Sequence, residues 1–331
     1  MGISAESPVG GTIVTPVRKR RKGAGTALTW LAVTPFAAWA VARLAGLERG
    51  SLATQIMTAT PYAAAGSLVP LLIAAIRRKR AATVVALLAS AALGLSVLPR
   101  ALGSAEATTG RSLRVMSLNL LFGRADTETV MRLVREFDPD VLSTQELTPG
   151  AVADLDAAGL KDLMPHRMLE DEWSAGGSGL YSKHALKPLW DLIPPVGHKM
   201  PAAVISLPGG APIEFIDVHP YPPLGEQVAN WNAALSSLPS AGEGTVRILA
   251  GDFNASLDHA AMRRLLDRGY KDAADQVGAG LIPTWPANKR VPPIITIDHV
   301  LVDRRVGVRE VSVHTVPGTD HRAVLAELTV P

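Results

Sequence analysis

Six short segments of the chain carry polar side chains of the kinds that bind divalent metals or transfer protons. In chain order they are Ser117-Leu118-Asn119, Gln145-Glu146, Asp217-Val218-His219, Gly251-Asp252-Phe253-Asn254, Ile297-Asp298-His299 and Thr319-Asp320-His321. The chain has no cysteine, which excludes disulfides, thiolate metal sites and a cysteine nucleophile. Oxygen donors at this density suit Mg²⁺ or Mn²⁺, and Mg²⁺ usually keeps waters that a phosphate displaces. The segments therefore predict a Mg²⁺ site for phosphoryl chemistry.

The elements that must position these residues are short strands that alternate with a few helices. Apolar runs predict strands over residues 114–119, 141–145, 179–182, 202–207, 213–219, 246–250, 294–302, 308–315 and 323–330. Helical spacing predicts helices over residues 126–137, 225–238 and 258–267. Many strands with few helices favour an α/β sandwich of two sheets. The polar segments end or interrupt the apolar runs, so stacked strands would gather them at one rim, where ligand sites form.

The first hundred residues have a different pattern, with three uncharged runs between basic clusters. The runs cover residues 23–42, 50–76 and 81–99, which is 20, 27 and 19 residues. At about 1.5 Å per residue, roughly 20 helical residues span a ~30 Å hydrocarbon core. No run has the recurring polar face that a soluble helix needs, although Pro61 and Pro70 interrupt the second. We therefore predict three transmembrane helices.

This pattern divides the chain into four parts. We expect a basic cytoplasmic N-terminus at residues 1–22, a three-helix membrane anchor at 23–102, a small polar linker at 103–112 and a catalytic domain at 113–331. Residues 1–102 hold 12 Lys and Arg against 2 Asp and Glu, and the remainder holds 21 against 28. The net charges of +10 and −7 exclude a uniformly basic nucleic-acid binder.

The positions of the basic clusters predict the orientation of the anchor. Residues 18–22 and 77–80 carry the strongest positive charge and belong on the cytoplasmic side under the positive-inside rule. The lighter segment at residues 43–49 suits an outer loop, and Arg100 at the outer end departs from the rule. Three crossings would make this a multi-pass protein of the cell membrane with an extracytoplasmic catalytic domain.

The polar segments occur in an order that resembles a known family. The set LNL, QE, GLYSK, DVHP, GDFN, IDHV and TDH is similar to the motifs of the endonuclease/exonuclease/phosphatase superfamily. That group contains DNase I, exonuclease III-type repair enzymes and neutral sphingomyelinases. The resemblance covers residues 113–331 and implies a four-layer αββα sandwich. It also implies a metal-dependent enzyme that hydrolyses phosphoesters or phosphoanhydrides.

The resemblance assigns a metal side to the site. Glu146 would be the main Mg²⁺ ligand, Asn119 would lie beside it, and Asp320 would complete this side. Several nucleases of the family carry an acidic residue two positions after the first Asn, where this chain has Leu121. That departure argues against a second metal position bound by an acid.

The resemblance also implies the catalytic groups. Asp298 would hold the imidazole of His321 in one tautomer, and the pair would act as general base or phosphate contact. Asp252 and Asn254 would contact the phosphate, the attacking water or a second metal. His219 would donate to a phosphoryl oxygen in the transition state. A His with an unperturbed pKa of about 6.5 can accept or donate a proton near neutral pH.

Several of these polar residues also have a purely structural interpretation. Glu146 could be a helix-start carboxylate and His219 a satisfied edge histidine, while His299 and Asp217 are expected to be structural. Trp285 would either line the mouth of the site or cap the core. We expect surface or solvated positions for the remaining polar residues of interest: His166, His184, His198, His259, His314, Asp272 and Asp275.

The predicted tether bears on the substrate, because a linker of about ten residues keeps the site close to the membrane. Residues 103–331 carry a net charge of −7 and lack clustered Lys or Arg, which makes nucleic acid an unlikely partner. A lipid-linked phosphate is the expected substrate, with membrane lipids as the surroundings. The layout resembles membrane-anchored teicoplanin-resistance proteins, which implies a cell-wall carrier such as undecaprenyl pyrophosphate.

Three alternatives to this function stay open. The chain could be an extracytoplasmic nuclease or a phosphodiesterase of phospholipids or sphingomyelin. It could also be a membrane-bound binding protein with an inactive site. No sequence pattern indicates a protein partner.

Overall fold

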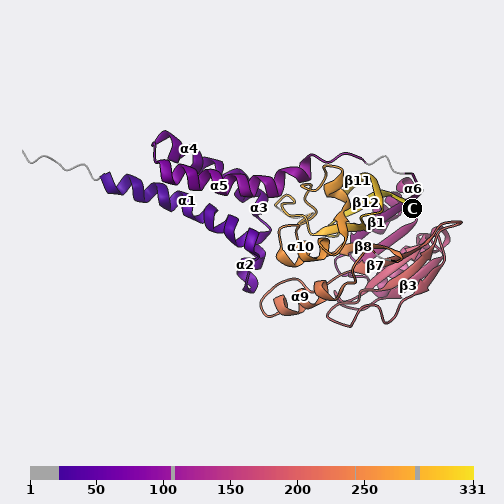
Figure 1. Cartoon of the computed structure of the whole chain (residues 1–331). Helices are drawn as coiled ribbons and strands as arrows, with labels where there is room; N and C mark the ends of the chain where they lie inside the picture. Colours follow the sequence, from indigo (N-terminus) through magenta and orange to yellow (C-terminus); the bar gives the residue numbers. More distant parts are fainter. Residues whose placement is uncertain (1–21, 106–108, 243, 288–290) are drawn as a thin grey trace, which may run out of the picture.

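The chain has a helical N-terminal segment that projects from one end of a two-sheet domain (Figure 1). The computed structural model describes residues 22–105, 109–242, 244–287 and 291–331. The predicted cytoplasmic N-terminus therefore lies almost wholly outside the described residues, as does the middle of the predicted linker.

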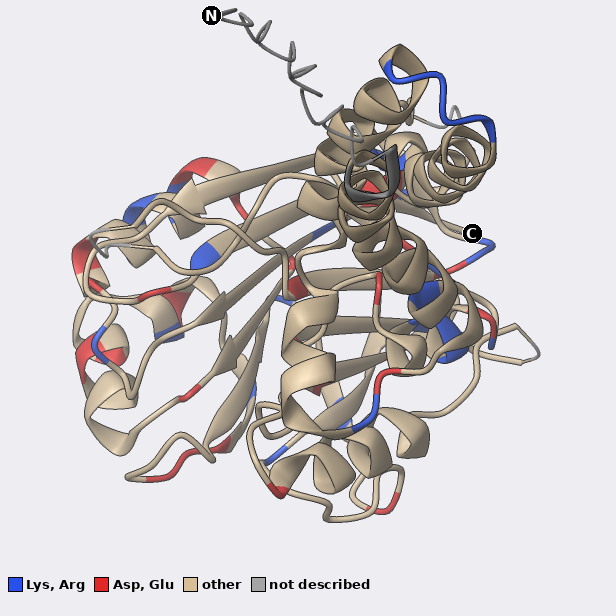
Figure 2. Cartoon of the chain, turned by 90° about the vertical axis from the view of Figure 1, so that its left-hand side faces the viewer, with Lys and Arg blue, Asp and Glu red and all other residues tan. Residues whose placement is uncertain are grey.

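The helical segment has five α-helices and one short 3₁₀ turn. They are α1 (Lys22–Ala45), α2 (Gly50–Met57), α3 (Thr60–Gly66), α4 (Leu68–Ile76), α5 (Arg80–Val97) and η1 (Leu98–Ala101). A basic turn joins α4 to α5 at the end of the helices that is remote from the domain (Figures 1 and 2).

Two stretches of this segment are long and apolar enough to cross a membrane, Gly25–Ala45 and Arg80–Ala101. The prediction of three transmembrane helices is not confirmed, because the middle run is bent by 65° between Gly50–Met57 and Thr60–Ile76. It counts as a third span only if that bent pair is one span. Pro61 lies in the first turn of α3, and proline lacks the N–H that would continue the hydrogen bonding of α2.

The domain contains two six-stranded sheets. The first has the order β11 (Gly307–Thr315), β12 (Arg322–Val330), β1 (Arg111–Asn119), β2 (Val141–Gln145), β4 (Ser178–Ser182) and β3 (His166–Glu170). The second has the order β5 (Leu186–Pro188), β6 (Ala202–Ser206), β7 (Pro212–Val218), β8 (Val246–Asp252), β10 (Asp298–Asp303) and β9 (Tyr270–Asp272). The predicted strands form, except that residues 294–297 of the predicted 294–302 strand are a loop before β10. β3, β5 and β9 were not predicted because they are short and lack an alternating pattern.

The two sheets pack face to face, and helices cover their outer faces. Alternate residues of the strands form the central core, among them Val115, Phe215 and Val300. The intervening residues of the first sheet pack against α6 (Thr127–Phe137), α7 (Pro149–Ala157) and α8 (Leu160–Leu163). Those of the second sheet pack against α9 (Gln227–Ser237) and α10 (Ala260–Leu266), and α11 (Ala273–Gln276) precedes β10. This is the predicted α/β two-sheet fold, with its four layers in the order αββα.

A buried ion cluster fixes the helical segment to the domain. Arg43 Nε lies 3.1 Å from Asp258 Oδ1, and Arg100 Nη1 and Nη2 lie 2.9 and 2.7 Å from the two oxygens of Asp258. The Asp258 side chain is completely buried. Arg100, which does not fit the predicted positive-inside pattern, has its charge balanced by this carboxylate inside the protein. The next residue, His259, was expected on the surface; that expectation is wrong, because its buried Nε2 donates to the carbonyl of Thr54 at 2.8 Å.

Candidate active site

The sheet topology brings the ends of six strands to one edge of the sandwich. β1 runs parallel to β2, and β7 runs parallel to β8, so their carboxyl ends lie together in each sheet. β10 is antiparallel to β8 and β12 to β1, so both begin where the other strands end. The polar segments predicted from the sequence occupy these strand ends, and the structure brings all eight predicted site residues into one cluster.

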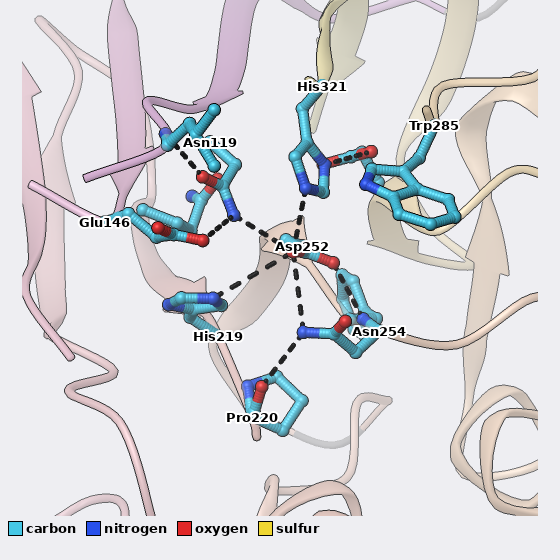
Figure 3. A network of polar contacts seen from close by, with 12 residues as sticks. Asn119, Glu146, His219, Pro220, Asp252, Asn254, Trp285 and His321 are labelled. Carbon is cyan, nitrogen blue, oxygen red and sulfur yellow. Dashed lines mark hydrogen bonds and ion pairs between the residues drawn. The ribbon is translucent and has the colours of Figure 1, made fainter. Parts of the chain in front are cut away.

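The first sheet contributes an amide that joins two carboxylates. Asn119 Nδ2 donates to Glu146 Oε1 and to Asp252 Oδ2, both at 3.1 Å (Figure 3). Its Oδ1 accepts from the backbone of Leu121 at 2.9 Å, and Glu146 Oε2 accepts from the backbone of Phe122 at 2.9 Å. These bonds fix the orientation of both side chains.

The second sheet places Asp252 at the centre of the cluster. Its Oδ1 accepts from the backbone of Asn254 at 2.8 Å, and its Oδ2 lies 3.9 Å from His219 Nε2. The Asn254 amide donates to the carbonyl of Pro220 at 3.1 Å (Figure 3). Gly251 lets β7 and β8 approach, because a Cβ there would lie 2.1 Å from the carbonyl oxygen of Val218.

His321 and Asp298 form a buried pair beside Asp252. His321 Nδ1 lies 3.0 Å from each Asp298 oxygen, which leaves Nε2 facing Asp252 Oδ2 at 3.7 Å. Asp320 Oδ1 lies 3.9 Å from the same Nε2, and Asp320 Oδ2 accepts from Trp285 Nε1 at 3.2 Å. An imidazole held in this way presents one nitrogen to the site in a defined orientation.

Burial and close charges alter the proton affinities of the cluster. Burial raises the pKa of Glu146 and raises that of Asp252 to about 7. Burial disfavours the charged form of His321, but the Asp298 and Asp252 carboxylates outweigh it and raise the pKa to about 10. Burial also lowers the pKa of His219 well below its usual range, and the neighbouring histidines lower it further. In the metal-free protein at neutral pH, His321 is therefore a proton donor and His219 is neutral.

The donor set fits a hard divalent cation. Carboxylate and amide oxygens dominate it, and buried carboxylates with raised pKa values gain from a nearby cation. Among the described side chains, Asp252, Asp298 and His321 offer ligand atoms that lie within 4.8 Å of one another. On the predicted metal side, Glu146 and Asp320 are the residues that would hold Mg²⁺. Asn119 faces the cluster with its Nδ2, because its Oδ1 accepts from Leu121, so it would orient Glu146. A bound cation would polarise a phosphoryl oxygen as a Lewis acid.

Four non-glycine residues of the site have left-handed backbone conformations. Their φ angles are +48° at Leu121, +52° at Phe122, +53° at Glu146 and +47° at Asn254. Such conformations cost free energy and tend to occur where a side chain must point in an unusual direction. They support a functional origin for this geometry.

A cavity of about 490 Å³ opens over the cluster. Its polar lining includes Glu146, His219, Asp252, Asn254, Asp320 and His321. Its apolar lining includes Leu121, Phe122, Leu224, Ile294, Ile295, Ile297 and Trp285. Trp285 therefore lines the site, which agrees with one of its two predicted roles. Within the described part of the chain, no Lys or Arg lines this cavity.

Several lining residues were missed by the sequence analysis. His198 was expected on the surface, but it is half-buried and its ring centre lies 4.4 Å from that of His219. Burial lowers the pKa of His198 to about 4. Gln55 and Thr58 of the helical segment also line the cavity. No local pattern distinguishes these residues, since only the fold brings them to the site.

Among the residues expected to be structural or solvated, Asp217 and His299 are structural and Asp272 is not solvated. Asp217 is buried and accepts from Gln145 at 2.7 Å, so its role is structural, as predicted. His299 is also buried, and its Nδ1 lies 2.8 Å from Asp272. The expectation that Asp272 is solvated is therefore wrong, because this carboxylate is the buried partner of His299.

Comparisons with known proteins agree with this geometry. A model of the Endonuclease/Exonuclease/phosphatase family matches residues 116–321. A search of curated proteins finds no match.

Solved structures share the fold at low sequence identity. An endonuclease/exonuclease/phosphatase from Beutenbergia cavernae is 20% identical with a TM-score of 0.55, over 66% of this chain and 72% of that one. A humanized D. rerio TDP2 is 17% identical with a TM-score of 0.52, over 66% and 99%. A protein from Bacteroides vulgatus is 16% identical with a TM-score of 0.51, over 67% and 100%.

Proposed function

The chain belongs to the endonuclease/exonuclease/phosphatase family of hydrolases, and from this premise we propose that it is a membrane-anchored, Mg²⁺-dependent hydrolase of a lipid-linked phosphate. The catalytic domain would face the extracytoplasmic side. The proposed bond is a phosphoester or pyrophosphate bond next to the lipid.

The shape and lining of the cavity are the observation that carries this proposal. One part of the lining is a polar cluster suited to a phosphate and a cation, and another part is apolar. Phe122, Leu224 and Ile294 are 46%, 53% and 45% exposed, so apolar surface extends outward from the cluster. A phosphate attached to a hydrocarbon chain matches both parts. A nucleic-acid backbone would instead favour basic residues, which the described lining lacks.

The side chains of the cluster can supply the proton transfers of hydrolysis. As the oxygen of a water molecule bonds to phosphorus, the water must lose a proton and the bond to the leaving group must break. Asp252 lies at the centre of the cluster, with its Oδ2 3.9 Å from His219 and 3.7 Å from His321, and is placed to accept that proton. His321 is protonated at neutral pH and is suited to donate to a phosphoryl or leaving-group oxygen. The Mg²⁺ would be held by Glu146 and Asp320, with Asn119 orienting Glu146 through its amide.

The candidate spans support a lipid carrier as the substrate. The layout of apolar helices before a catalytic domain resembles VanJ, a teicoplanin-resistance membrane protein. That resemblance favours undecaprenyl pyrophosphate and a role in glycopeptide resistance. The Arg43–Asp258–Arg100 cluster would keep the domain close to the bilayer.

Phosphate release from undecaprenyl pyrophosphate by the detergent-solubilised full-length protein in Mg²⁺ tests the proposal. The matched control is His321→Ala, which removes a site imidazole. We expect release by the wild type and little release by the variant. Equal release by both would reject the site assignment.

Absence of release by a folded wild-type protein would reject the lipid pyrophosphate. Single-stranded DNA and sphingomyelin, offered in the same buffer, then test the nuclease and phosphodiesterase alternatives directly. Turnover of either would assign a different substrate to the same hydrolase.

A further inference from the structure

The bent part of the helical segment lies against the catalytic cavity. α2 ends at Met57, and α3 begins at Thr60 after a bend of 65°. Gln55 and Thr58 line the cavity together with Glu146 and His321. The hydroxyl of Thr58 donates to the carbonyl of Gln55 at 2.7 Å, which orders the end of α2. Part of the cavity wall therefore comes from the anchor itself.

Hydrogen bonds fix this wall to two loops that also line the cavity. Ser51 Oγ donates to the carbonyl of Pro223 at 3.1 Å and accepts from the backbone of Gly225 at 3.0 Å. The hydroxyl of Tyr62 donates to the carbonyl of Ile294 at 2.6 Å. Pro223 and Ile294 are both cavity residues. The bent segment thus connects two loops that border the site.

A third attachment joins the wall to the loop that carries the catalytic residues. β8 ends at Asp252, and the segment that follows carries Asn254 and continues to Asp258 and His259. Asp258 is held by Arg43 and Arg100, and His259 donates to the Thr54 carbonyl. These buried contacts set the position of α2 relative to the polar cluster. The anchor is therefore not a tether on which the domain swings freely.

The outer surface of the wall is apolar. Leu52, Ile56 and Tyr62 are 72%, 43% and 52% exposed, and the cavity beside them is lined by Leu224 and Ile294. An apolar chain held against this surface stays out of water while its phosphate reaches the polar cluster.

We infer that the α2–α3 bend is the wall that receives the hydrocarbon chain of the substrate, with Gln55 and Thr58 as specificity-determining residues. This inference rests on the proposed function and deepens it, because it makes chain length the property that the site selects. Long-chain lipid phosphates bind along the bend, whereas short prenyl phosphates use only the polar cluster.

Two pyrophosphates with the same reactive bond test this inference in the full-length protein. Undecaprenyl pyrophosphate provides a long chain, and isopentenyl pyrophosphate provides a short one. Thr58→Trp fills the cavity beside the bend, and the control Leu163→Trp adds the same ring at an exposed position of α8, outside both the lining and the bend. We expect kcat/KM for the long chain to fall about tenfold or more in Thr58→Trp, with the short chain within about twofold. Leu163→Trp should leave both values unchanged.

Equal losses for both substrates in Thr58→Trp would overturn the inference, as would unchanged turnover of the long chain. Failure of the wild type to hydrolyse either pyrophosphate would instead reject the proposed function. The two failures are therefore distinct.

A binding measurement covers the case in which Thr58→Trp does not fold. Because the chain has no cysteine, Thr58→Cys introduces a single thiol into the full-length protein. We expect undecaprenyl phosphate to slow maleimide labelling of this thiol about fivefold or more, since a bound chain excludes the reagent. Inorganic phosphate should have no effect, and the thiol of Leu163→Cys should be unaffected by either. Labelling that the lipid does not slow would overturn the inference without any measurement of turnover.

Discussion

Asp258→Asn tests whether the buried ion cluster holds the helical segment on the domain. The Asp258 side chain is 0% exposed, and those of Arg43 and Arg100 are 10% and 7% exposed. Asn has nearly the same shape, but without the carboxylate charge it leaves two buried guanidinium groups uncompensated. Breaking a buried ion pair by removing one partner costs about 3–5 kcal/mol. We take about 3 kcal/mol as the expected loss, because the Asn oxygen still accepts one hydrogen bond.

Hydrogen exchange by mass spectrometry reports this loss at the interface. The backbone N–H of Gly280 donates to the carbonyl of Arg100 at 3.1 Å, and that of Ala260 donates to the Glu48 carboxylate. Both amides exchange only when the interface opens. A loss of about 3 kcal/mol should therefore accelerate their exchange by about two orders of magnitude.

Asp303→Asn is the matched control, since it removes another buried carboxylate that pairs with an arginine. Asp303 is 1% exposed, binds Arg305 and lies at the opposite end of β10 from Asp298. We expect exchange at Gly280 and Ala260 to stay slow in this variant. Unchanged exchange in Asp258→Asn, or equal acceleration in both variants, would refute the reasoning.

Three further predictions concern the site and its surroundings. Asp298→Asn removes the charged acceptor of His321 Nδ1, so turnover should fall about 10²–10⁴-fold. The pKa of His321, which is about 10 in the native protein, should also fall in an NMR titration. Full activity of this variant would contradict the pairing. If Mg²⁺ binds the folded wild type, a Mg²⁺ concentration of 100 times the Kd stabilises it by about 2.7 kcal/mol and raises its Tm. Glu146→Ala should abolish this rise in Tm. A Glu146→Ala protein that Mg²⁺ still stabilises would reject Glu146 as a ligand. Burial lowers the pKa of His259, so below about pH 6.5 only the unfolded chain takes up its proton and the free energy of unfolding falls. His259→Gln should reduce this slope by up to about 1.4 kcal/mol per pH unit in denaturant titrations, and an unchanged slope would contradict the assignment.

The sequence alone determined the architecture of the domain and the composition of its polar cluster. Strands and amphipathic helices are visible because a period of 2 or 3.6 residues is a local property. Asn119, Glu146, Asp252 and His321 are conspicuous because each interrupts or follows an apolar run. Parallel and antiparallel pairing then brings such strand ends to one edge, which is a consequence of chain direction.

The tertiary structure decided which distant residues act on that cluster. Arg43 and Arg100 lie 215 and 158 positions from Asp258, and neither shows any local sign of a buried partner. Burial itself depends on the surroundings in space, so His259 and Asp272 could not be separated from surface residues by composition.

The bend between α2 and α3 is a second feature of the site that a local sequence pattern cannot predict. An apolar run that contains Pro61 and Pro70 is compatible with either a straight span or a broken one, because neighbouring groups can satisfy the freed carbonyls. Contacts of Ser51, Thr54 and Tyr62 with the domain select the broken form and turn Gln55 and Thr58 toward the cavity. The sequence thus determined the polar chemistry through local pattern. Only long-range packing decided that part of the helical segment lines the cavity.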